Sequence, residues 1–129
     1  MAIKKYYVTV DDLGNSHWYK GAKCKVLHRE DSPAIEQYDS TMLWHQNGQL
    51  HRTNGPAIEW RDGEKRWYQN GRLHRTDGPA IERCNGTKEW YINDKRMTEA
   101  EFLAVTQPVI EMAVADVEKL VGKRVKIIK

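Results

Sequence analysis

The feature that most constrains the fold is an internal repeat. The sixteen residues WHQNGQLHRTNGPAIE, from Trp44 to Glu59, recur as WYQNGRLHRTDGPAIE from Trp67 to Glu82. The residues that keep this 23-residue step are the His-Arg pairs starting at 28, 51 and 74, the prolines at 33, 56 and 79, and the Ala-Ile-Glu triplets that follow each proline. Periods of roughly 20–50 residues are typical of arrays in which each unit packs on its neighbours. The sequence therefore predicts a stack of equivalent structural units.

The repeat divides the chain into two predicted parts. Residues 1–97 form a repeat domain, and residues 98–129 form a helical C-terminal segment with a basic tail. The copies in the first part are a degenerate one at about 15–40, full ones at 41–63 and 64–86, and a partial one at 87–97. Trp18 lies three residues early relative to the step, so the first copy carries an insertion.

Each copy has the sequence pattern of β-hairpins. Asp62-Gly63 and Asn85-Gly86 stand between short strand-like runs, which is the strongest local hairpin signal. Asn47-Gly48 and Asn70-Gly71 mark a second tight turn in each copy, and the Gly-Pro pairs mark a third change of direction. We therefore predict a mainly β protein with C-terminal helices (α+β). Its repeat domain is an extended antiparallel β-hairpin stack, covered or extended by one or two helices.

The C-terminal segment has helix signals. Thr98 and Glu101 form a capping box, in which the Thr hydroxyl accepts from the backbone of Glu101 and the carboxylate reaches back. Pro108 suits the first turn of a second helix at about 107–121, whose apolar residues fall at helical spacing. This apolar stripe would cover the sheet or an open edge, and a homodimer through the C-terminal helix is the compatible alternative.

Composition narrows the class of protein. Five Trp and six Tyr against one Phe favour a thin sheet that is partly exposed to solvent, or a binding face, over a thick core. A net charge of +3 falls short of a dedicated nucleic-acid binder. The spacing of Cys24 and Cys84 resembles neither a secreted disulfide framework nor a zinc motif, and the N-terminus shows no apolar signal region. No apolar stretch is long enough to span a membrane. These features favour reduced thiols in a cytoplasm.

The motif W-Y-x-N-G-x-L-H with its 23-residue step resembles the membrane occupation and recognition nexus (MORN) repeat over about residues 15–96. Where that family has a second glycine, this chain has Arg29, Arg52 and Arg75, and in the second and third copies its glycine comes three positions later. The pattern W-Y-x-N-G-x-x-H-R-x-D-G-P-A is closer to repeat proteins of large tailed bacteriophages. This resemblance implies a phage source, an extended hairpin stack and action in the cytoplasm of the infected bacterial host. It implies no activity and no cofactor.

The histidine row is a weak candidate for chemistry. Equivalent residues of successive copies would lie at least roughly 10 Å apart, which is too far for His28, His51 and His74 to share a metal ion. A His-Asp pair could act in acid–base catalysis, but a pair written into each copy favours a structural role. Asp31, Asn54 and Asp77 would then cap turns. We therefore expect no metal site and no enzymatic activity.

The arginine row is the stronger candidate for binding. Arg29, Arg52 and Arg75 could form ion pairs with the glutamates of the Ala-Ile-Glu triplets, or they could hold phosphates beside aromatic rings. The candidate binding residues are Arg29, Arg52, Arg75, His51, His74, Trp60 and Tyr68.

These features predict a non-enzymatic phage accessory binding protein, a host-takeover or counter-defence factor that binds a host protein. The first alternative is a sponge that sequesters a nucleotide immune signal. The second is a nucleic-acid-binding protein that uses the arginine row and the basic tail.

Overall fold

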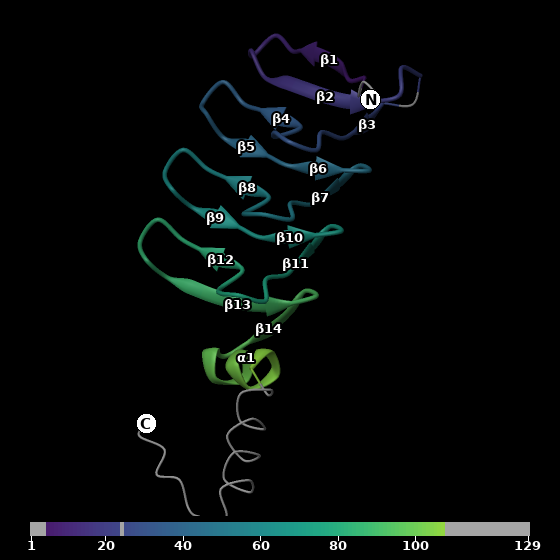
Figure 1. The fold of residues 1–129 in the computed structure, drawn as a ribbon. Helices are drawn as coiled ribbons and strands as arrows, with labels where there is room; N and C mark the ends of the chain where they lie inside the picture. The colour runs from purple at the N-terminus through teal and green to yellow at the C-terminus, as the bar shows by residue number, and fades with distance from the viewer. Residues whose placement is uncertain (1–4, 24, 108–129) are drawn as a thin grey trace, which may run out of the picture.

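The strands stack as successive layers along one axis, and a helix lies below the last layer (Figure 1). This computed structural model describes residues 5–23 and 25–107. The elements are β1 (Tyr7–Val10), β2 (Ser16–Lys20), β3 (Val26–Leu27), β4 (Ile35–Glu36), β5 (Met42–Leu43), β6 (His45–Gln46), β7 (Gln49–Leu50), β8 (Ile58–Glu59), β9 (Lys65–Arg66), β10 (Tyr68–Gln69), β11 (Arg72–Leu73), β12 (Ile81–Glu82), β13 (Lys88–Ile92), β14 (Lys95–Met97) and α1 (Glu99–Thr106).

Every strand pairing is antiparallel, and the main sheet runs in the order β1-β2-β4-β5-β8-β9-β12-β13-β14, with β3 paired to β2. The predicted class, mainly antiparallel β with a C-terminal helix, is confirmed. The short strands β6-β7 and β10-β11 form separate two-stranded ladders.

Each full copy is one long hairpin that carries a bulge. In the third copy, β9 pairs with β12 and β10 pairs with β11. Between these ladders the Trp67 amide donates to the Ala80 carbonyl at 2.8 Å, and the Trp67 carbonyl accepts from His74 at 3.1 Å. One strand therefore pairs with both halves of its return strand, and residues 75–79 are looped out. Trp44 makes the same two bonds in the second copy and Trp18 makes them in the first, so residues 52–56 and 29–33 are looped out there.

The tight turns follow from residues that accept positive φ. Asn70 and Gly71 have φ of 51° and 79°, and Asn47 and Gly48 have φ of 53° and 80°. Two successive positive values define the type I′ turn, whose twist matches that of the paired strands. The Gly71 amide also donates to the Leu50 carbonyl of the preceding copy at 2.9 Å. The turn is thus also a junction between layers.

Paired residues share one face of an antiparallel sheet, and neighbours along a strand point to opposite faces. Register and alternation therefore assign the side chains to two faces. The tryptophan face carries Trp18, Trp44, Trp67 and Trp90, together with the looped-out segments. The tyrosine face carries Tyr19, His45, Tyr68 and Tyr91 in equivalent positions, with Ile35, Ile58 and Ile81.

The core is thin. The buried apolar residues of the described chain are Ala34, Trp44, Ala57, Ile58, Ala80, Ile81 and Phe102. The three alanines are completely inaccessible, and each directly follows the looped-out segment of its copy. The layers are therefore held mainly by backbone ladders and by polar and aromatic side chains that cover a small apolar centre.

The helix α1 ends the stack. The Thr98 hydroxyl accepts from the Glu101 amide at 3.1 Å, as the capping box predicts, and the same hydroxyl donates to the Glu101 carboxylate at 3.1 Å. Phe102 is 3% exposed and lines a cavity with Trp90, because α1 packs on β13 and β14. The helix thus covers the last tryptophan, where the earlier copies use a looped-out segment. The second helix and the basic tail predicted by the sequence lie outside the described residues.

Candidate interaction faces

On the tryptophan face, an arginine of each looped-out segment stacks on the tryptophan of its own copy. The guanidinium carbons of Arg29, Arg52 and Arg75 lie 4.1, 3.8 and 3.9 Å from the ring centroids of Trp18, Trp44 and Trp67. A guanidinium plane over an indole combines cation–π attraction with dispersion. The arginine row predicted by the sequence is therefore a row of Arg–Trp stacks.

The same guanidinium groups hold the looped-out segments in place. Nη1 of Arg52 donates to the Pro56 carbonyl at 3.1 Å and to the Glu59 carboxylate at 3.3 Å. The corresponding bonds join Arg29 to Pro33 and Glu36, and Arg75 to Pro79 and Glu82. The glutamate ladder considered from the sequence is present in all three copies. Arg75 also donates from Nε to Asp77 at 2.8 Å, which lowers the pKa of that carboxyl.

Glycine before proline leaves room for the guanidinium. A Cβ built on Gly78 would lie 2.9 Å from Cζ of Arg75, and one on Gly55 would lie 3.0 Å from Cζ of Arg52. The arginine is therefore sandwiched between an indole ring and a bare Cα. The first copy has Ser32 at this position, and there the stack and the bond to the proline carbonyl are longer, at 4.1 and 3.3 Å.

The histidines join each copy to the next. Nδ1 of His51 accepts from the Asn70 amide at 3.0 Å, and Nδ1 of His74 accepts from the Asn93 amide at 3.2 Å. His28 makes the same bond to Asn47 in the first copy, at 3.0 Å. An Nδ1 that accepts places the proton of the neutral ring on Nε2. These contacts assign His51 and His74 a structural role in the free protein.

Polar grooves separate successive looped-out segments. The groove beside the second copy has a volume of about 570 Å³ and is lined by Glu30, Asp31, Trp44, Gln46, His51, Arg52, Thr53 and Asn54. The next one, of about 450 Å³, includes the equivalent Trp67, Gln69, His74 and Arg75. Carboxylates and arginines mix along both grooves, so neither presents one sign of charge.

The tyrosine face carries the other two candidate residues. Arg66 lies over the Trp60 ring, with 5.0 Å from its guanidinium carbon to the ring centroid. Burial by itself lowers the pKa of Arg66, but hydrogen bonds to Glu64 and Tyr68 raise it overall. Trp60 and Tyr68 thus flank one arginine. The structure brings them together and places them on the opposite face from the arginine row.

An ion-pair network extends this cluster to the last strands. Arg83 lies 3.9 Å from Glu64 and donates to Glu89 at 3.1 Å, and the Tyr91 hydroxyl donates to the same carboxylate at 3.3 Å. The hydrogen bond from Arg83 lowers the pKa of Glu89. The sequence repeat did not point to this network, because Glu64, Arg83 and Glu89 are replaced by residues of other types in the equivalent positions of the other copies. The alternation of side chains between the two faces of paired strands was the signal that could have located them.

His45 stands on the tyrosine face where the other copies have tyrosine. It is 9% exposed, and its Nδ1 is buried without a hydrogen-bond partner in the described structure. Burial lowers the pKa of its imidazole, although the Leu43 backbone acts in the opposite direction. Burial at this position therefore favours the neutral form of the ring.

Within residues 5–23 and 25–107, no group of three or more His, Cys, Asp or Glu side chains is placed to hold a metal ion. Cys84 is an exposed free thiol. No helix of the described part is long and apolar enough to cross a membrane.

Comparisons of this chain with protein family models, with curated proteins and with solved structures find no match. The candidate site is therefore defined by its geometry.

Proposed function

We propose that this chain is a non-enzymatic binding protein whose tyrosine face binds another protein. The observation that carries the proposal is the half-exposed cluster of Trp60, Tyr68, Tyr91 and Arg66 on one side of the sheet. Tyr, Trp and Arg are the residues that most often contribute binding energy at the centre of protein interfaces. The tyrosine face presents them together.

The contacts of the arginine row on the tryptophan face also favour a protein partner on the tyrosine face. Each guanidinium of the arginine row is stacked on a tryptophan and bonded to a carbonyl and a carboxylate of its own copy. Nη1 of Arg52 is already bonded to Pro56 and Glu59, so a phosphate would meet only the remaining Nε and Nη2 donors and would lie near the Glu59 carboxylate, which would repel it. These contacts favour a protein partner over a nucleotide or RNA. The likeness to phage repeat proteins favours a partner from the infected bacterium.

The experiment is affinity capture from lysate of an infected culture, followed by titration of the captured protein against purified variants. Tyr68→Ala removes a central ring, and Tyr68→Phe keeps the ring while removing its hydroxyl. Tyr38→Ala is the matched control, because Tyr38 is a 76% exposed tyrosine on a turn outside the cluster. We expect Tyr68→Ala to weaken binding by roughly 30-fold or more, in line with an interface hot spot. Tyr38→Ala should leave it unchanged.

The proposal fails if Tyr68→Ala and Tyr38→Ala bind the partner as tightly as the unmodified chain while circular dichroism shows both folded. It also fails if the logarithm of the binding constant falls steeply and linearly with the logarithm of the salt concentration, because that dependence is the signature of phosphate contacts.

A further inference from the structure

The two ends of the sheet differ. At the C-terminal end, α1 packs on β13 and β14 and buries Phe102. At the other end, β1 pairs with β2 and with no further strand of the described chain, so one of its edges is open (Figure 1). An open edge is a template for pairing with another strand.

This edge is also apolar. Tyr7, Val8 and Val10 of β1 are 38%, 55% and 66% exposed, and Leu13 in the following turn is 72% exposed. Of the large exposed apolar side chains in the described chain, only Leu103 and Val105 lie at the opposite end. The strand itself, Tyr-Val-Thr-Val, contains none of the charged or proline residues that usually prevent edge-to-edge pairing.

The register of β1 defines which backbone groups are free. Val8 is paired with Trp18, but the Trp18 amide donates to Ala34 and its carbonyl accepts from His28. Trp18 therefore turns its backbone groups away from β1, and Val8 in turn directs its own amide and carbonyl to the open edge. By the same alternation, Tyr6 and Val10 point their backbone groups outward. The open edge thus presents three evenly spaced donor–acceptor pairs.

We propose that β1 pairs antiparallel with β1 of a second copy, about a two-fold axis through Val8. In this register Val8 lies opposite Val8 and Tyr6 lies opposite Val10, so all outward backbone groups find partners. The side chains of Tyr6, Val8 and Val10 share the tryptophan face, on which Val8 is already paired with Trp18. The interface is isologous, as expected for a homodimer.

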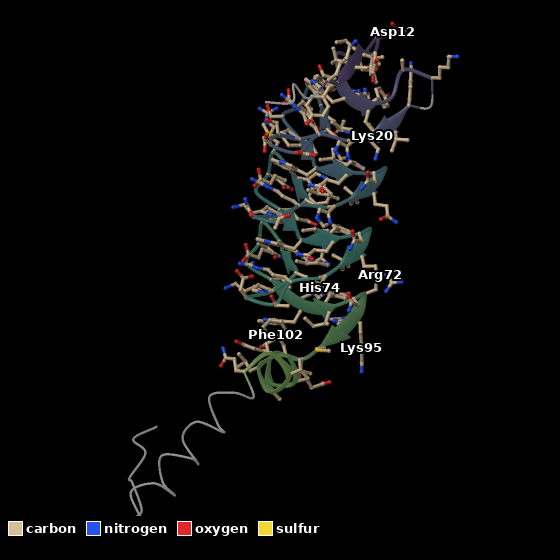
Figure 2. The ribbon with its side chains drawn as sticks, turned by 45° about the vertical axis from the view of Figure 1, so that its right-hand side comes forward. Asp12, Lys20, Arg72, His74, Lys95 and Phe102 are labelled. Atoms are coloured by element: carbon tan, nitrogen blue, oxygen red, sulfur yellow. The ribbon has the colours of Figure 1, made fainter. Side chains whose placement is uncertain are left out.

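Charge complementarity favours a second copy as the occupant of this edge. The strand is basic at its start, with Lys5, and acidic at its end, with Asp11 and Asp12. Antiparallel pairing about Val8 places Lys5 of each copy opposite Asp11 of the other. Parallel pairing in register would place Lys5 beside Lys5 and Asp11 beside Asp11 of the other copy. The exposed Asp12 projects at the same end of the stack (Figure 2), where it adds to the acidic side of the pair.

The dimer does not depend on the proposed partner. Residues opposite each other across an antiparallel pair share a face, so the tyrosine faces of the two copies join into one surface. A dimer without a captured protein would disprove the proposed function alone, and a monomer that still binds the partner through Tyr68 would disprove the dimer alone.

The first test removes the backbone donor. Val8→Pro deletes an amide that β2 does not use, so proline is compatible with the folded edge strand. Val8→Thr is the matched control, because it keeps the donor and the β-branched shape. Sedimentation equilibrium of the full chain should show a monomer–dimer equilibrium. Val8→Pro should raise the dissociation constant of the dimer at least about tenfold, because two symmetric hydrogen bonds are lost. Val8→Thr should raise it by no more than about threefold.

The second test reads the register by disulfide cross-linking in a chain whose Cys24 and Cys84 are replaced by serine. Two Val8→Cys copies would place their Cα atoms about 5.5 Å apart, within the range of a disulfide. Two Val10→Cys copies would lie about 13 Å apart along the strands and should not cross-link. A monomer at all concentrations, a dimer unaffected by Val8→Pro, or equal cross-linking of the two cysteine variants would each overturn the proposal.

Discussion

Replacing Arg75 by alanine tests whether the arginine row holds the layers together. The Arg75 side chain is 19% exposed, stacks on Trp67 at 3.9 Å and donates to the Pro79 carbonyl at 3.1 Å. A partly desolvated cation–π contact contributes about 1 kcal/mol, and a charged hydrogen bond to a carbonyl about 1.5 kcal/mol. The half-exposed Glu82 adds at most about 1 kcal/mol, and the exposed Asp77 adds little.

Because these terms overlap, we expect Arg75→Ala to lower the free energy of unfolding by about 2–4 kcal/mol. Arg75→Lys keeps the charge but loses the planar fork, so it should lie between alanine and the unmodified chain. Arg72→Ala is the matched control, because Arg72 lies in β11 directly after the turn and its exposed side chain has no partner among the described residues.

The assay is urea unfolding followed by tryptophan fluorescence and far-ultraviolet circular dichroism in parallel. Arrays of repeats can unfold in stages, so coincidence of the two signals is needed before a free energy is assigned. A loss below about 0.5 kcal/mol for Arg75→Ala, equal to that of Arg72→Ala, would refute the reasoning. The row would then be free to serve a ligand.

Three further predictions concern other contacts within and between the layers of the stack. His45→Tyr restores the residue of the other copies. Since the pKa of His45 is lowered from 6.5 on folding, its contribution to stability is present above that value and is lost as the pH falls toward the folded pKa. Urea unfolding of His45→Tyr should therefore vary less between about pH 5 and 7, and an unchanged slope would contradict this. His51→Ala removes the acceptor of the Asn70 amide and should cost about 0.5–1.5 kcal/mol in the same assay, with faster exchange of that amide hydrogen; unchanged exchange would show that the bond is not formed. Gly78→Ala places a Cβ 2.9 Å from Arg75 Cζ and should destabilise by about 1–2 kcal/mol, whereas a gain of stability would show that the sandwich has room.

The sequence by itself determined the kind of fold. Asn-Gly and Asp-Gly pairs at regular spacing specify tight turns through local backbone preferences, which need no information from distant residues. The Asn70-Gly71 turn and the Thr98 cap are where these rules place them. The ion pairs of the arginine row were one of two alternatives that the sequence left open, and the structure contains them in all three copies.

Only the tertiary structure decided which side chains share a face. Trp60 and Arg52 were candidates for one site, yet register places them on opposite sides of the sheet, since a shift of one residue reverses the face of a side chain. The bond from His51 to Asn70 spans 19 residues and depends on how successive layers pack. The open edge of β1 likewise follows from the topology. Such contacts are set by pairing between copies, which local sequence preferences do not encode.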